Sequence, residues 1–139
     1  MNDLHESQEI LEACDQFADL NEPGLIERLK TILSGVPELH KETSSEPRNI
    51  LFELVMAAML KREGLEFHLD RIEDVSFEFI GSPWFMECKR IRSKSKLRER
   101  INNAALQIVE RCDNSQNSEA KGIIALDVSK LLNDGTRIL

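Results

Sequence analysis

Hydrophobic positions in the first part of the chain recur at helical spacing. In residues 4–20 the apolar positions from Ile10 onward lie three or four apart, which predicts an amphipathic helix. We expect a second, short helix over residues 23–33, ended by the glycine that follows it. Residues 36–46 are the most polar stretch and the best linker candidate. A third helix, with a clear apolar stripe, is expected over residues 47–64.

After Gly64 the period of the pattern falls from about four to two, which is typical of strands. Apolar and polar residues alternate through residues 65–70, 75–79 and 84–89. Gly81-Ser82-Pro83 combines three turn-forming residues between the second and third runs. The pattern therefore predicts three short strands joined as a meander.

The remainder of the chain returns to a helix and then a strand. Residues 96–112 show helical spacing, and residues 113–120 form a polar loop. Residues 122–126 are a continuous apolar run, which predicts a strand buried on both faces. The class is α/β, with a mixed central sheet flanked by helices. We expect a single domain, made of an acidic helical extension and linker (1–46) and an α/β core (47–139).

Charge is distributed unevenly along the chain. The net charge of −7 disfavours nucleic-acid binding, but residues 1–70 hold 6 Lys/Arg against 15 Asp/Glu (−9), whereas residues 71–139 hold 12 against 10 (+2). Residues 89–100 carry seven basic residues and only Glu99 as an acid, a local charge of +6. Such a segment can contact phosphates even in an acidic protein. The alternative is that this segment is a solvated helix start, which is the more common explanation of a lone basic run.

Composition limits the compartment and the kind of site. No apolar run approaches the ~20 residues of a membrane span, and the N-terminus is polar and acidic rather than a secretory signal. Cys14, Cys88 and Cys112 are an odd number of cysteines without CxxC spacing, which argues against a disulfide framework and a structural zinc site. We expect a reduced, cytoplasmic protein that does not enter a membrane.

Alternation in the second and third strands gathers charged residues on one face. If the apolar sides share the core, Asp74, Glu87 and Lys89 lie together on the other side. A connecting loop with an even number of residues keeps Asp74 in phase, whereas a three-residue loop or a bulge selects Glu73. Two carboxylates can hold Mg²⁺, and a neighbouring lysine can position water and stabilise charge on a phosphate. This combination suits phosphodiester hydrolysis.

The set of residues resembles the PD-(D/E)XK nuclease superfamily of the restriction-endonuclease-like fold. Asp74, twelve intervening residues and Glu87-Cys88-Lys89 lie within a helix–strand–strand–strand–helix–strand order, and the resemblance covers about residues 47–128. It implies that Glu53, on the first core helix, joins the metal site. It also suggests Gln107 as the polar residue of the following helix.

The chain departs from the family pattern in three places. Arg111 stands where one subgroup has a tyrosine after its glutamine, and Glu73 rather than proline precedes Asp74. The chain also ends about ten residues after the fourth strand, where family members often continue. We therefore expect either a minimal core or part of a longer protein.

The resemblance implies a divalent-metal-dependent endonuclease that hydrolyses DNA, in restriction, phage defence or repair. Asp74, Glu87 and Glu53 would bind Mg²⁺, with Mn²⁺ as a substitute, and Lys89 would assist the attacking water. Basic residues after the site would grip the DNA backbone; these are Lys94, Lys96, Arg98 and Arg100. Because cutting a duplex takes two incisions, we expect a homodimer.

Two other interpretations stay open. The first is a non-catalytic module of the same fold that binds a protein or nucleic-acid partner, with the acidic N-terminal helices as the protein-binding surface. The second is that Asp74, Glu87 and Lys89 form only a structural cluster of ion pairs. Divalent-metal binding separates the enzyme from both.

Overall fold

The computed structural model describes residues 2–19, 23–33, 46–71 and 74–132. The elements, in order, are α1 (Asn2–Phe17), α2 (Pro23–Leu33), α3 (Glu46–Arg62), β1 (Phe67–Arg71), β2 (Asp74–Phe79), β3 (Ser82–Arg90), α4 (Lys94–Asn114), β4 (Lys121–Asp127) and α5 (Ser129–Leu132). The expected helices and strands are all present, and the short α5 is an addition. The expected linker lies outside the described residues, apart from its last residue, which begins α3.

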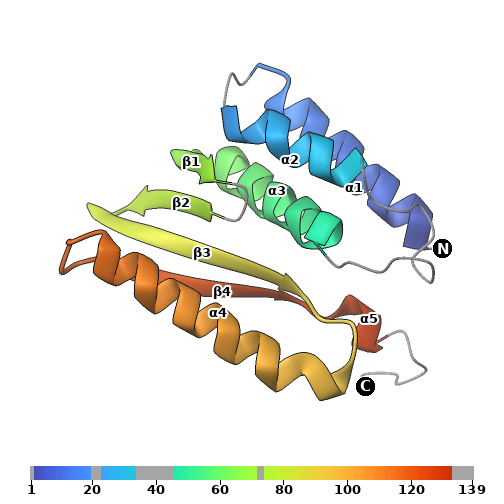
Figure 1. The fold of residues 1–139 in the computed structure, drawn as a ribbon. Coiled ribbons are helices and arrows are strands. Elements are labelled where there is room, and N and C mark those ends of the chain that lie inside the picture. The colour runs from blue at the N-terminus through green and yellow to red at the C-terminus, as the bar shows by residue number, and fades with distance from the viewer. Residues whose placement is uncertain (1, 20–22, 34–45, 72–73, 133–139) are drawn as a thin grey trace.

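The helices form layers around one sheet. Figure 1 shows α3 against one face, α1 and α2 stacked beyond α3, and α4 against the opposite face. Phe17 of α1 and Leu25 of α2 belong to the same buried cluster as Leu54 of α3 and Met86 of β3. The N-terminal helices therefore complete the core of the α/β unit, which buries apolar surface on α3 that would otherwise face water.

The sheet is mixed, as the sequence predicts. Its strand order is β1-β2-β3-β4, with antiparallel pairing of β1 with β2 and of β2 with β3, and parallel pairing of β3 with β4. The expectation that residues 122–126 are buried on both faces is wrong. Residues 121–123 are exposed and 124–127 only half-buried, because β4 is an edge strand. Among the described helices, none has the length and apolar character that a bilayer crossing requires.

The turn between β2 and β3 lies one residue earlier than expected. Phe79 pairs with Ser82, so Ile80 and Gly81 form a two-residue turn, and Pro83 belongs to β3. Both turn residues have positive φ, 51° at Ile80 and 71° at Gly81. This is the geometry of the hairpin turns that match strand twist. Glycine adopts it freely, but a β-branched residue does so only under strain.

Replacing Ile80 with asparagine should therefore stabilise the protein. Its side chain is 86% exposed and contributes little packing, whereas the left-handed backbone costs roughly 1–2 kcal/mol in an ordinary residue. We expect Ile80→Asn to raise the free energy of unfolding by about 1 kcal/mol in urea titrations, since asparagine tolerates this conformation. Gly81→Ala should lower it. An unchanged or lower stability of Ile80→Asn would contradict this turn geometry.

Candidate functional site

The pairing of β2 with β3 decides which acidic residue of β2 lies across from Glu87. Val75 pairs with Met86, so Asp74, the first residue of β2, takes the next register position, opposite Glu87. Directly opposed residues of an antiparallel pair share a face of the sheet. The two-residue turn supplies the even spacing that favours Asp74 over Glu73. Glu73 and the side chain of Asp74 lie outside the described part of the chain.

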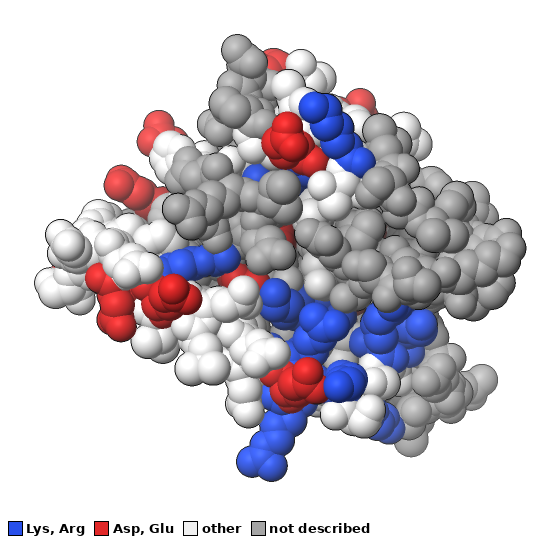
Figure 2. Space-filling view, viewed as in Figure 1, with Lys and Arg blue, Asp and Glu red and all other residues white. Residues whose placement is uncertain are grey.

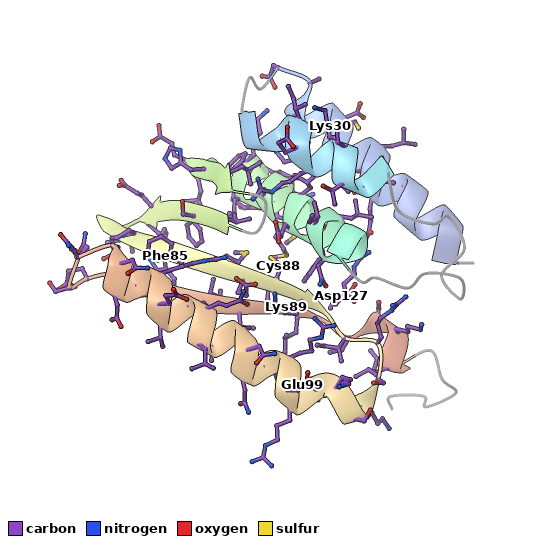
Figure 3. All side chains as sticks on the ribbon, in the orientation of Figure 1. Lys30, Phe85, Cys88, Lys89, Glu99 and Asp127 are labelled. Atoms are coloured by element: carbon purple, nitrogen blue, oxygen red, sulfur yellow. The ribbon has the colours of Figure 1, made fainter. Side chains whose placement is uncertain are left out.

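The strand β3 separates its side chains cleanly between the two faces. Met86 and Cys88 belong to the core cluster with Leu54 of α3. Glu87 and Lys89 alternate with them and face α4. Figure 3 shows Cys88 on the side of β3 toward α3 and Lys89 on the side toward α4. The expected charged face therefore exists, and a helix covers it.

Glu87 is a fully buried carboxylate held by two cations. The Nζ of Lys89 lies 2.5 Å from its Oε1, and Nη2 of Arg111 lies 2.9 Å from its Oε2. Arg111 also donates from Nη1 to the carbonyl oxygen of Met86 at 3.4 Å. We refer to Glu87, Lys89 and Arg111 as the β3–α4 cluster. Its three side chains sum to one positive charge.

Arg111 is the residue of this cluster that the sequence analysis did not assign. It contacts β3 because it lies two turns after Ala104, the one buried residue among the described positions of α4. This seven-residue spacing repeats on one face of a helix and was the available signal. Gln107, one turn before Arg111, is half-buried on the same helix.

Glu53 is engaged elsewhere. It is 2% exposed on α3, and its Oε2 accepts a hydrogen bond of 3.3 Å from Nε of Arg28, which is fully buried. Arg28 also donates from Nη1 to the carbonyl oxygen of Gly24 at 3.2 Å. Glu53 lies on α3 and Glu87 pairs with α4, and these helices cover opposite faces of the sheet; the described ion pair of Glu53 is with Arg28. Arg28 was missed although it follows the buried Leu25 by three residues.

The basic residues after the site fall into two groups. Lys94, Lys96 and Arg98 are exposed in the first turns of α4, and Lys96 donates to Glu99 at 2.7 Å. Figure 2 shows basic side chains gathered over the end of β3 and the start of α4. These residues form a basic surface at the start of α4, whereas Arg111 of the β3–α4 cluster lies in the last turn of that helix.

Arg90 instead joins α1 and α3 to the sheet. Its guanidinium lies 2.7 Å from Glu9 of α1 and 2.8 Å from Asp127 of β4, and its backbone N–H donates to Asn49 of α3 at 3.0 Å. Burial raises the pKa of Asp127, but hydrogen bonds from Ser129 and the charge of Arg90 outweigh burial, so the net shift is downward. Because its pKa is lowered, Asp127 stays ionised at pH values somewhat below the ordinary pKa of an aspartate. Its contribution to stability is present above that ordinary pKa and is lost as the pH falls through the lowered one.

Cys88 is a core side chain, as expected, and not a nucleophile. It is 1% exposed. Burial raises the pKa of its thiol, and the charges of Glu53 and Glu87 raise it further. A protonated, enclosed thiol neither attacks a substrate nor binds a metal.

A cation on this face of the sheet would need Glu87 together with Asp74, whose side chain lies outside the described part of the chain. The described residues contain no group of three His, Cys, Asp or Glu that could hold a metal. Glu87 and Asp74 would give two carboxylates, a number that Mg²⁺ accepts together with water and phosphate oxygens. The three-carboxylate form with Glu53 does not fit this arrangement. Even the two-carboxylate form requires Arg111 or Lys89 to release an oxygen of Glu87.

Comparison of the chain with protein-family models, with curated proteins and with solved structures found no match.

Glu53→Gln should cost stability and leave metal binding intact. It removes the Glu53 carboxylate beside the buried guanidinium of Arg28, and breaking a buried ion pair typically costs about 3 kcal/mol. We expect this loss in urea titrations both with and without Mn²⁺. The double variant Arg28→Met/Glu53→Leu should recover most of it. Normal stability with abolished Mn²⁺ binding in Glu53→Gln would instead make Glu53 a metal ligand.

Proposed function

We propose that this chain has the restriction-endonuclease-like fold and is a divalent-metal-dependent endonuclease acting on DNA. One observation carries the proposal: the β2–β3 register, in which Val75 pairs with Met86, extends by one residue to Asp74 and Glu87, and Lys89 Nζ lies 2.5 Å from the Glu87 carboxylate. The element order from α3 to β4 agrees with what the sequence resemblance implies. The three cysteines, which form no disulfide, suit a reducing cytoplasm.

Each residue of the site has a definable task in phosphodiester hydrolysis. Asp74 and Glu87 would hold the cation. A bound Mg²⁺ supplies a water of lowered pKa and neutralises charge on the phosphate. Lys89, beside Glu87, donates to the attacking water or to a phosphate oxygen, where charge grows in the transition state. Burial of the cluster strengthens these interactions, because water screens them poorly there.

The DNA-binding surface would be the start of α4. Lys94 and Arg98 are exposed, and the helix begins directly after β3 and the site. Cations that neutralise phosphates release condensed counterions, so affinity should fall steeply with salt.

A non-catalytic module of the same fold is the second candidate. Both oxygens of Glu87 are held by cations, and Glu53 is held by Arg28, so these carboxylates already have structural partners. A hollow of about 270 Å³ between α1 and α3 offers a protein-binding surface. Its lining includes the acidic residues Glu9, Glu12 and Asp15. This candidate predicts neither metal binding nor cleavage.

A cleavage assay separates the two candidates. The substrates are supercoiled plasmid and circular single-stranded DNA, each with Mg²⁺, Mn²⁺ or EDTA. We expect cutting with either metal and none in EDTA. Lys89→Ala should reduce the rate by about 100-fold, in the range for loss of one transition-state donor.

Lys30→Ala is the matched control. Lys30 is exposed on α2, far from the site, and pairs only with the exposed Glu27 among the contacts described. It should cut like the wild type, and thermal melting should show that Lys89→Ala is folded. A folded wild type that neither cuts either substrate nor binds Mn²⁺ would overturn the nuclease proposal.

Removing Arg111 should strengthen metal binding if the site is catalytic. Arg111→Gln takes one cation away from Glu87, and we expect Mn²⁺ affinity by titration calorimetry to rise about tenfold, equivalent to ~1.4 kcal/mol. Glu87→Gln should abolish binding. Arg98→Gln is the control, since this exposed arginine lies near the helix start. In a structural cluster, Arg111→Gln would lower stability and still bind no metal.

A further inference from the structure

The outer edge of β4 has no partner strand among the described residues. The sheet order places β3 on one side of β4 and nothing on the other. Ile123 is 39% exposed, although it lies level with Met86, which is buried in the core. β4 thus presents a seven-residue row of backbone groups with an apolar side chain beside it.

The two edges of the sheet differ in how they resist pairing. β1 has five residues, a register shift between His68 and Arg71, and α2 packed against it. Short, irregular and charged edges of this kind discourage association with another chain. β4 lacks these features: residues 122–126 read Gly-Ile-Ile-Ala-Leu, and their register with β3 is unbroken. The unpaired backbone N–H and C=O groups of such an edge can pair with an added strand.

The sequence of β4 is complementary to itself. A two-fold axis through Ile124 places Lys121 of one copy opposite Asp127 of the other, twice, with only apolar residues between the pairs. Opposite charges directly across antiparallel strands stabilise the pairing. Asp127 also accepts from Arg90 and from the backbone N–H of Ser129 in its own chain, so the Lys121 of the second copy would share this carboxylate with them. Any other register of the two strands separates both charge pairs. The charge pattern therefore selects a second copy of this chain, in antiparallel orientation, as the occupant.

The helix beside this edge also presents apolar surface. Arg111 of α4 contacts β3, and Ile108 lies so close to Gly122 of β4 that an added Cβ would meet it at 1.9 Å. Val109, the next residue of α4, is 56% exposed. A copy added at this edge would cover Ile123.

We propose that β4 is a homodimer interface, in which two copies join their sheets into one of eight strands about a two-fold axis at Ile124. Because an axis perpendicular to the sheet keeps its faces in place, both β3–α4 clusters lie on the same side of the dimer. This inference rests on the edge strand and does not depend on nuclease activity.

Sedimentation velocity on the full chain at about 1–100 µM tests the proposal. We expect a species of twice the 15.9 kDa chain mass. Lys121→Asp places two aspartates across each pair and should weaken the dimer at least tenfold. Ile123→Lys should do the same by adding charge beside the axis. Lys94→Asp is the matched control: it makes the same charge change at an exposed position on α4 and should leave the dimer intact.

Urea titration and amide hydrogen exchange provide two further measurements of this interface. Lys121 also lies over the ring of Trp84, so urea titration must show that Lys121→Asp remains folded. If that variant fails to fold, Ile123→Lys decides. Amide exchange at residues 121–127 should slow as protein concentration rises. A wild type that stays monomeric at about 100 µM, or a dimer unaffected by both edge variants, would overturn the proposal.

Discussion

The burial of one carboxylate, that of Glu87, constrains how α4 packs against the sheet. Glu87 is removed from water between the sheet and α4, which is tolerable only with close counter-charges. Lys89 supplies one from the same strand and Arg111 supplies the other from the helix. This requirement fixes the rotation of α4 about its axis. It thereby determines that Ala104, two turns before Arg111, also faces the sheet.

A second buried pair plays the corresponding part on the other face. Arg28 and Glu53 join α2 to α3 as Glu87 and Arg111 join β3 to α4. Between them lies the apolar layer that includes Met86 and Cys88. Strand alternation keeps the two charged centres apart: one anchors α2 to α3, and the other joins β3 to the last turn of α4.

The sequence predicts local pattern well and long-range partners poorly. Alternation correctly located β3 and the face shared by Glu87 and Lys89, and the mixed α/β class is confirmed. The turn was misplaced because Ile80 adopts a backbone conformation that its side chain disfavours. β4 was expected to be buried because an apolar run looks the same at an edge as at the centre of a sheet. Arg28 and Arg111 meet their carboxylates across 25 and 24 residues of chain, which no local spacing reveals.

The absence of a side chain at Gly122 allows α4 to pack close to β4, and this affects the position of Arg111 in the β3–α4 cluster. A side chain at this position of β4 would overlap Ile108 and push α4 away from the sheet. Arg111 lies three residues further along that helix, so the same displacement would withdraw its guanidinium from Glu87. The absence of a side chain on one strand thus sets the electrostatic environment of a carboxylate on the next. The ionic chemistry of the site is governed in part by the volume of a residue that carries no charge.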